Sequence, residues 1–144
     1  MKLNHFFLLL FVLLSGIACT KESDKDDPKD KTQLLTQKTW VYNELFYSYN
    51  TTATTVVYKR GKPQNAQNFD MVTVKFNTDG TFIERTVTGT TLNGTWKFLS
   101  NETQVETKHS QGTYVTNIIS LTEDVYTWYD PFKSGGIYGE NIHE

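Results

Sequence analysis

The sequence predicts an all-β fold, an antiparallel up-and-down meander of about eight strands closed into a small barrel. Apolar and polar residues alternate with a period of two, short polar turns separate these stretches, and no internal stretch has the pattern of a helix of about 10–12 residues. Without such helices, parallel βαβ crossovers are excluded. An eight-stranded barrel is either filled by side chains or holds one small ligand, and the pattern leaves both open.

A leader of different composition precedes the predicted barrel. Lys2 is followed by the unbroken apolar run 6–14, which is much shorter than the roughly 20 residues that a helix needs to cross a bilayer. A cationic start, a short apolar centre and then small residues are typical of a secretory signal peptide. We therefore expect residues 1–18 to be a signal peptide.

The leader ends in the sequence Ser-Gly-Ile-Ala-Cys at residues 15–19. This resembles the lipobox of bacterial lipoproteins, which implies that Cys19 carries a diacylglycerol and becomes the mature N-terminus. Two or three acyl chains, such as palmitate, give a stable membrane anchor. Cys19 is the single cysteine of the chain, so an intramolecular disulfide is excluded. The alternative is a free cysteine that is lost with the leader.

A charged segment links Cys19 to the predicted barrel. Nine of the twelve residues at 20–31 are charged and none is aliphatic or aromatic, so we expect a disordered tether over 19–31. The charges just after Cys19 resemble the surface-export signals of lipoproteins in some Gram-negative bacteria, and a plain spacer is the alternative. The expected location is the bacterial cell envelope, anchored by lipid in the outer membrane and exposed at the surface.

The predicted domain spans residues 32–144. It opens with a helical turn near residues 32–37, and the alternation is clear at Val72, Val74 and Phe76. Asp79-Gly80 can supply the positive φ of a tight hairpin, and an irregular tail is expected after residue 129. The predicted strands are 39–49, 54–59, 71–76, 81–87, 92–99, 104–108, 114–121 and 125–129.

Several short motifs of this domain resemble those of small bacterial lipocalin-like lipoproteins. They are Leu-Leu-Thr-Gln-Lys-Thr-Trp at 34–40, Phe-Asn-Thr-Asp-Gly-Thr-Phe at 76–82, Gly-Thr-Trp-Lys-Phe at 94–98 and the hairpin at 119–128. The resemblance implies a barrel whose closed end is plugged by Trp40. It also implies a cavity for a small apolar or amphipathic ligand.

The inward-facing aromatic residues are the candidate ligand-binding set. They either line a cavity or form a solid core, because a small barrel needs bulky side chains to fill it. A third interpretation concerns 126–129, where aromatic residues fall on both faces of one strand and an exposed pair could stack on a sugar or a protein. The candidates are Trp40, Tyr42, Phe76, Phe82, Trp96, Phe98, Tyr126 and Trp128.

Little in the chain predicts catalysis, a metal or a cofactor. His109 and His143 stand alone, and no nucleophile elbow, phosphate loop or zinc-protease motif occurs. Glu84, Glu106 and Asp130 are expected on solvent faces or in turns. The net charge of −2, or −3 without residues 1–18, makes nucleic acid a poor partner.

The expected function follows from these patterns together. It is a cell-envelope lipoprotein, not an enzyme, whose barrel binds a small apolar or amphipathic ligand. The alternative is a structural or interaction module with a filled barrel that contacts a glycan or a protein through its outer surface.

Overall fold

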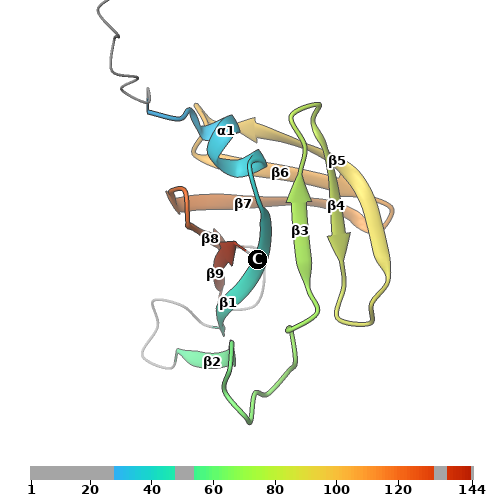
Figure 1. Cartoon of the computed structure of the whole chain (residues 1–144), viewed down its shortest axis with the longest axis vertical. Helices are drawn as coiled ribbons and strands as arrows, with labels where there is room; N and C mark the ends of the chain where they lie inside the picture. The colour runs from blue at the N-terminus through green and yellow to red at the C-terminus, as the bar shows by residue number, and fades with distance from the viewer. Residues whose placement is uncertain (1–27, 48–53, 132–135, 144) are drawn as a thin grey trace, which may run out of the picture.

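The computed structural model describes residues 28–47, 54–131 and 136–143, so Cys19 and the predicted signal peptide lie outside the described residues. One short helix and nine strands lie within these ranges (Figure 1). They are α1 Lys31–Thr36, β1 Thr39–Tyr47, β2 Thr55–Lys59, β3 Thr73–Phe76, β4 Thr81–Arg85, β5 Thr91–Leu99, β6 Gln104–His109, β7 Gly112–Leu121, β8 Val125–Asp130 and β9 Ile137–His143.

Eight of these strands form a closed antiparallel ring. Neighbours pair in the order β1, β3, β4, β5, β6, β7, β8 and β9, and β9 pairs back onto β1. The first half of β1 pairs with β3, and its second half pairs with β2, which stands outside the ring. The structure therefore confirms the predicted antiparallel barrel of eight strands.

The membership of the ring differs from the prediction at two strands: predicted strand 54–59 corresponds to β2 and lies outside the ring, and the ring gains a last strand that was not predicted. The C-terminal residues were expected to form an irregular tail, and this was wrong over Ile137–His143, which form β9 between β8 and β1. The glycines near this segment indicated a loop. At Gly139, however, a side chain would collide with the ring of Trp128, so the glycine is what allows this ring to lie against β9.

The helix α1 is short and is held by its cap and by one buried side chain. Asp30 Oδ1 accepts a hydrogen bond from the backbone N–H of Gln33 at 2.7 Å, and the backbone N–H of Asp30 donates to Gln33 Oε1 at 3.0 Å. This capping box satisfies backbone donors at the start of the helix. The predicted disordered tether over 19–31 was therefore wrong at Asp30 and Lys31, which cap and begin α1. Six residues make a marginal helix alone, so the burial of Leu35 holds α1 in place.

The helix α1 lies at one end of the barrel (Figure 1), and hydrogen bonds attach it and its flanking residues there. Lys75 at the end of β3 donates to the carbonyl of Thr36 at 2.7 Å. Lys31 donates to the carbonyl of Glu102 in the β5–β6 turn at 2.7 Å, and Gln37 donates to the carbonyl of Glu123 in the β7–β8 turn at 3.3 Å. This end of the barrel is called the closed end below.

Trp40 fills the closed end from the inside. Its side chain and that of Leu35 are fully buried, and its indole N–H donates to the Leu35 carbonyl at 2.8 Å. Around them lie buried residues from five other strands, and Trp40 meets the ring of Tyr126 edge-on with the ring centroids 5.9 Å apart. Trp40 thus plugs the closed end, as the lipocalin resemblance implies.

Gly94 lies inside β5, within the unbroken alternation of Leu92, Gly94 and Trp96. A Cβ atom at this position would collide with the ring of Phe82 and with the carbonyl oxygen of Lys108 on β6. The absence of a side chain therefore allows the ring of Phe82 to lie close to the backbone of β5.

We predict that Gly94→Ala lowers the free energy of unfolding by about 1–3 kcal/mol, because the added methyl group overpacks the core beside a paired backbone. Urea unfolding followed by tryptophan fluorescence measures the change. Asn93→Ala, on the exposed face of the same strand, is the control and should change this free energy by less than about 0.5 kcal/mol. Equal stability of Gly94→Ala and the natural protein would contradict the packing described.

Candidate functional site

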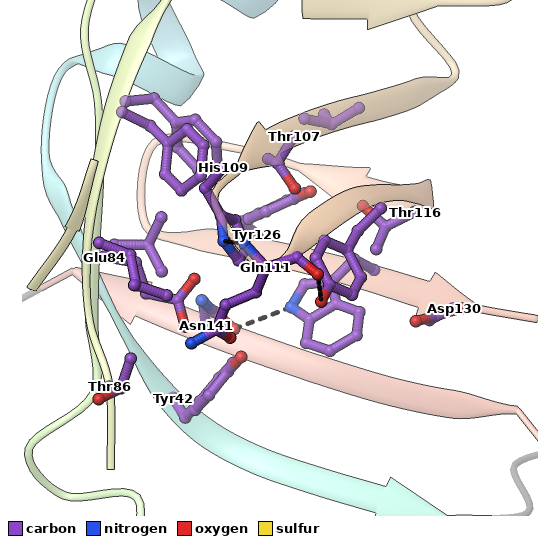
Figure 2. Close-up of a pocket in the computed structure, with 17 residues that line it drawn as sticks. Tyr42, Glu84, Thr86, Thr107, His109, Gln111, Thr116, Tyr126, Asp130 and Asn141 are labelled. Atoms are coloured by element: carbon purple, nitrogen blue, oxygen red, sulfur yellow. Dashed lines mark hydrogen bonds between the residues drawn. The ribbon is translucent and has the colours of Figure 1, made fainter. Parts of the chain in front are cut away.

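The barrel holds a cavity of about 270 Å³ that is partly open to solvent (Figure 2). At roughly 30 Å³ per molecule of liquid water, this volume corresponds to about nine waters. Its wall consists of Tyr42, Val74, Phe76, Phe82, Glu84, Thr86, Leu92, Val105, Thr107, His109, Gln111, Tyr114, Thr116, Tyr126, Trp128, Asp130 and Asn141.

Along three strands, the wall changes from apolar near the closed end to polar toward the opposite end. Residues i, i+2 and i+4 of a strand point to the same face, so three strands each contribute a row of side chains to the cavity. Each row begins with an apolar or aromatic residue near the closed end and finishes with a polar residue at the opposite end, called the mouth below. The rows are Phe82, Glu84 and Thr86 from β4 and the residue after it, Val105, Thr107 and His109 from β6, and Tyr126, Trp128 and Asp130 from β8.

The β6–β7 hairpin forms one side of the mouth. The ring of His109 stacks on that of Tyr114 with centroids 5.2 Å apart and 16° between the planes. The backbone N–H of Gln111 donates to His109 Nδ1 at 3.2 Å, and the Tyr114 hydroxyl donates to the Gln111 carbonyl at 3.4 Å. His109 is thus part of the cavity wall. It was expected to stand alone, and its alternation with Val105 and Thr107, which that expectation did not use, is the signal that could have placed it there.

The wall contains two acidic side chains that the sequence placed on the solvent face. Asp130 is only 7% exposed, and both it and Glu84 line the cavity, so the surface prediction was wrong for these two residues. It holds for Glu106, which pairs with Lys97 across the outer face at 3.0 Å. The alternation along a strand shows which residues share a face. It predicts that a carboxylate faces inward only if the barrel is known to contain a cavity, because a packed core would exclude the charge.

Trp128 and Asn141 both line the cavity and are joined by a hydrogen bond. The indole N–H of Trp128 donates to Asn141 Oδ1 at 3.0 Å, and Asn141 is buried (Figure 2). Tyr42 lies beside them, with its ring centroid 6.1 Å from that of Trp128. Behind Tyr42, Phe69 of the β2–β3 loop packs edge-on at 5.5 Å. The positions of the Tyr42 and Trp128 rings are therefore set by packing on both sides.

Five of the eight aromatic candidates line the cavity, and three do not. Trp40 lies below it at the closed end. Trp96 is 8% exposed and donates its indole N–H to the Asn77 carbonyl at 2.9 Å, while Phe98 is half-buried against it. These three residues belong to the packed part of the barrel. The five that line the cavity are Tyr42, Phe76, Phe82, Tyr126 and Trp128.

The aromatic residues of β8 do not form an exposed pair. Tyr126 and Trp128 point into the cavity, and Tyr129, on the other face, is half-buried. In the part of the chain that the structure describes, Tyr47 is the single exposed aromatic residue, at 37%.

The two deepest tyrosine hydroxyls stay protonated well above neutral pH. Burial raises the pKa of Tyr126 to about 12. Burial, and then the nearby charge of Glu84, raise the pKa of Tyr42 far above its ordinary value near 10. Both hydroxyls can therefore donate hydrogen bonds to a ligand across the physiological range.

Within residues 28–47, 54–131 and 136–143, no group of three or more His, Cys, Asp or Glu side chains is placed to hold a metal ion. No helix among these residues is long and apolar enough to span a membrane. The chemical resources of the cavity are thus hydrogen bonds, aromatic faces and two carboxylates.

A closed eight-stranded antiparallel barrel, plugged by a short helix and a tryptophan at one end and hollow toward the other, is a lipocalin-like fold. Solved structures agree. A DUF4847 family protein from Bacteroides vulgatus matches with a TM-score of 0.58 and 14% identity over 80% of this chain and 98% of its own. A lipocalin-like protein from Bacteroides uniformis matches with a TM-score of 0.52 and 13% identity over 77% and 99%.

An uncharacterized protein from Bacteroides eggerthii is also similar, with a TM-score of 0.50 and 12% identity over 74% of this chain and 98% of its own. At these identities the likeness concerns the fold alone. Neither the family models nor the curated proteins that were searched match this chain.

The raised pKa values predict how stability depends on pH. In the unfolded chain a tyrosine ionises near pH 10, whereas Tyr42 and Tyr126 keep their protons to higher pH in the folded protein. The unfolded state therefore loses protons first, and stability falls as the pH rises above about 10. Tyr42→Phe and Tyr126→Phe should each make this decline shallower, by at most about 1.4 kcal/mol per pH unit.

Urea unfolding of the two variants and the natural protein between pH 7 and pH 12 measures this slope. The values at pH 7 supply the baseline for each variant. Parallel declines in all three proteins would contradict the burial of both hydroxyls.

Proposed function

We propose that this protein is a non-catalytic, lipid-anchored protein of the bacterial envelope whose barrel binds one small amphipathic ligand. The observation that carries the proposal is the polarity gradient of the cavity. The base offers apolar surface from Phe76, Phe82 and Val105, and the mouth offers hydrogen-bonding groups from Thr86, His109 and other polar residues. A ligand with one apolar and one polar end satisfies both.

The size of the cavity limits the ligand further. Its 270 Å³ lies just below the roughly 300–1,000 Å³ typical of sites for drug-sized molecules. A volume of about nine waters accommodates a molecule on the order of ten non-hydrogen atoms. Burial of its apolar part contributes about 25 cal/mol per Å². The polar wall favours an amphipathic molecule over a purely apolar one.

The alternative of a filled barrel that binds a glycan or a protein through its outer surface has less support. Such recognition commonly uses a cluster of exposed tyrosine or tryptophan side chains. Tyr47 stands alone in this respect among the described residues. The hollow interior favours internal binding.

The anchoring part of the proposal rests on the sequence before residue 28. The apolar run 6–14, the lipobox-like residues 15–19 and the charged residues up to Asp27 occur in the order of a lipoprotein leader, lipidation site and tether. This order supports export, attachment through Cys19 and placement in the outer membrane, with the barrel exposed at the surface.

We predict that the protein, gently extracted from its own cells, carries a small molecule that native mass spectrometry detects as an added mass. Thr107→Phe should abolish the added mass, because the new ring fills the middle of the cavity. Thr95→Phe, on the exposed face of β5, is the matched control and should retain it. Ligand-free natural protein, or a ligand retained by Thr107→Phe, would count against internal binding.

We predict that Cys19→Ala abolishes labelling by radioactive palmitate and releases the protein from the membrane fraction. The thiol is the atom that would carry the diacylglycerol, and the remaining leader contributes no stable anchor once it is cleaved. Cys19→Ser is a second variant of nearly unchanged size that should behave in the same way. Retained labelling in either variant would refute the lipobox assignment.

A further inference from the structure

The charged side chains of the cavity wall are of one sign. Glu84 and Asp130 line the cavity, and none of the residues in its wall is a lysine or an arginine. The basic residues of the same strands lie on the outer face, where Arg85, Lys97 and Lys108 are exposed. The period of two explains this separation, because Glu84 and Arg85 are neighbours in the chain and point to opposite sides of the sheet.

Glu84 lies at mid-depth, between the apolar base and the polar mouth. On β4 it stands one inward position above Phe82 and one below Thr86. Its charge acts on the hydroxyl of Tyr42, whose pKa is raised first by burial and then by Glu84. Figure 2 shows Glu84 beside Asn141, the residue that accepts the indole N–H of Trp128. Carboxylate, amide and phenol thus converge on one level of the cavity.

Aromatic faces surround the same level. Tyr42 and Trp128 lie on one wall and Tyr126 lies just below, toward the closed end. A cation close to the face of such rings is attracted by their negative electrostatic potential, and the attraction is larger where water is excluded. A carboxylate flanked by aromatic rings is therefore suited to an organic ammonium group. An anionic ligand would face repulsion from Glu84 and Asp130, and a neutral one would gain no ion pair with either carboxylate.

From this convergence we infer that the ligand is a small organic cation: an amine whose ammonium group lies at the level of Glu84 and whose compact aromatic or aliphatic body occupies the base formed by Phe76, Phe82 and Val105. Asp130, nearer the mouth, adds negative charge along the path of entry. The inference rests on the proposed ligand-binding function and names the class of ligand for the same cavity.

The test compares three compounds of similar size that differ in charge: 2-phenylethylamine, 2-phenylethanol and phenylacetate. Isothermal titration calorimetry of the purified protein at pH 7 should give an affinity for the amine about tenfold or more above that for the alcohol, and no detectable binding of phenylacetate. This comparison uses the natural protein, so it does not depend on whether a variant folds.

Two variants then locate the charge. Glu84→Gln keeps the shape of the side chain and should weaken amine binding by about tenfold or more, while alcohol binding changes less than about twofold. Asp130→Asn should weaken amine binding by a smaller factor. Glu106→Gln, on the outer face of β6, is the matched control and should leave all affinities unchanged. Circular dichroism confirms that each variant is folded.

The outcomes separate the two proposals. If the alcohol or phenylacetate binds as tightly as the amine, or if Glu84→Gln leaves amine binding unchanged, the inferred cation is wrong while ligand binding in the barrel stands. If none of the three compounds binds at millimolar concentration and the extracted protein carries no added mass, both the cation and the proposed function are wrong.

Discussion

The pairing of β9 with β1 is the interaction on which the rest of the structure depends. It joins the last strand of the chain to the first, so the sheet has no open edge within the ring and its inward side chains face one another. Without it, Trp128 and Asn141 would be exposed on an open sheet, and Tyr42 would lose the wall opposite it. The contact also carries the longest sequence separation in the barrel. Such closure is slow to form and is expected late in folding.

The two ends of the ring are stabilised in different ways. At the closed end, Leu35 and Trp40 bring large apolar surfaces and an internal hydrogen bond, and the interior is packed there. At the mouth, short hairpins carry polar residues and the interior is left open. A protein of this size can leave room for a ligand because its packing is concentrated in one half. The packed part of the barrel and its cavity are thus spatially separated.

Much of the fold could be predicted from the sequence, because alternation, hairpin turns and the tryptophan at the start of the first strand each report on local geometry. The last strand could not be predicted, because Gly139 weakens the pattern that is typical of a strand. A glycine is needed there because any side chain would collide with the ring of Trp128 on the neighbouring strand. The candidate site was predictable only in part. Aromatic residues were expected inside, but Glu84 and Asp130 were assigned to the surface because a polar residue faces inward only where the core is hollow. Whether the barrel has a cavity depends on the total volume of all inward-facing side chains, and no single sequence motif determines that volume.

The chain enters the barrel beside α1, at the pole opposite the mouth. Asp30 caps the helix there, and Lys29 and Lys31 contact the turns of the same end. A protein held to a membrane through residues before Pro28 is therefore held by its sealed pole. If the proposed anchor at Cys19 and the proposed ligand are both correct, the ligand would exchange with the aqueous phase at the mouth, away from the end of the barrel where the chain enters. This polarity suits the capture of a dissolved solute, whereas a carrier that extracts lipid needs its opening against the membrane.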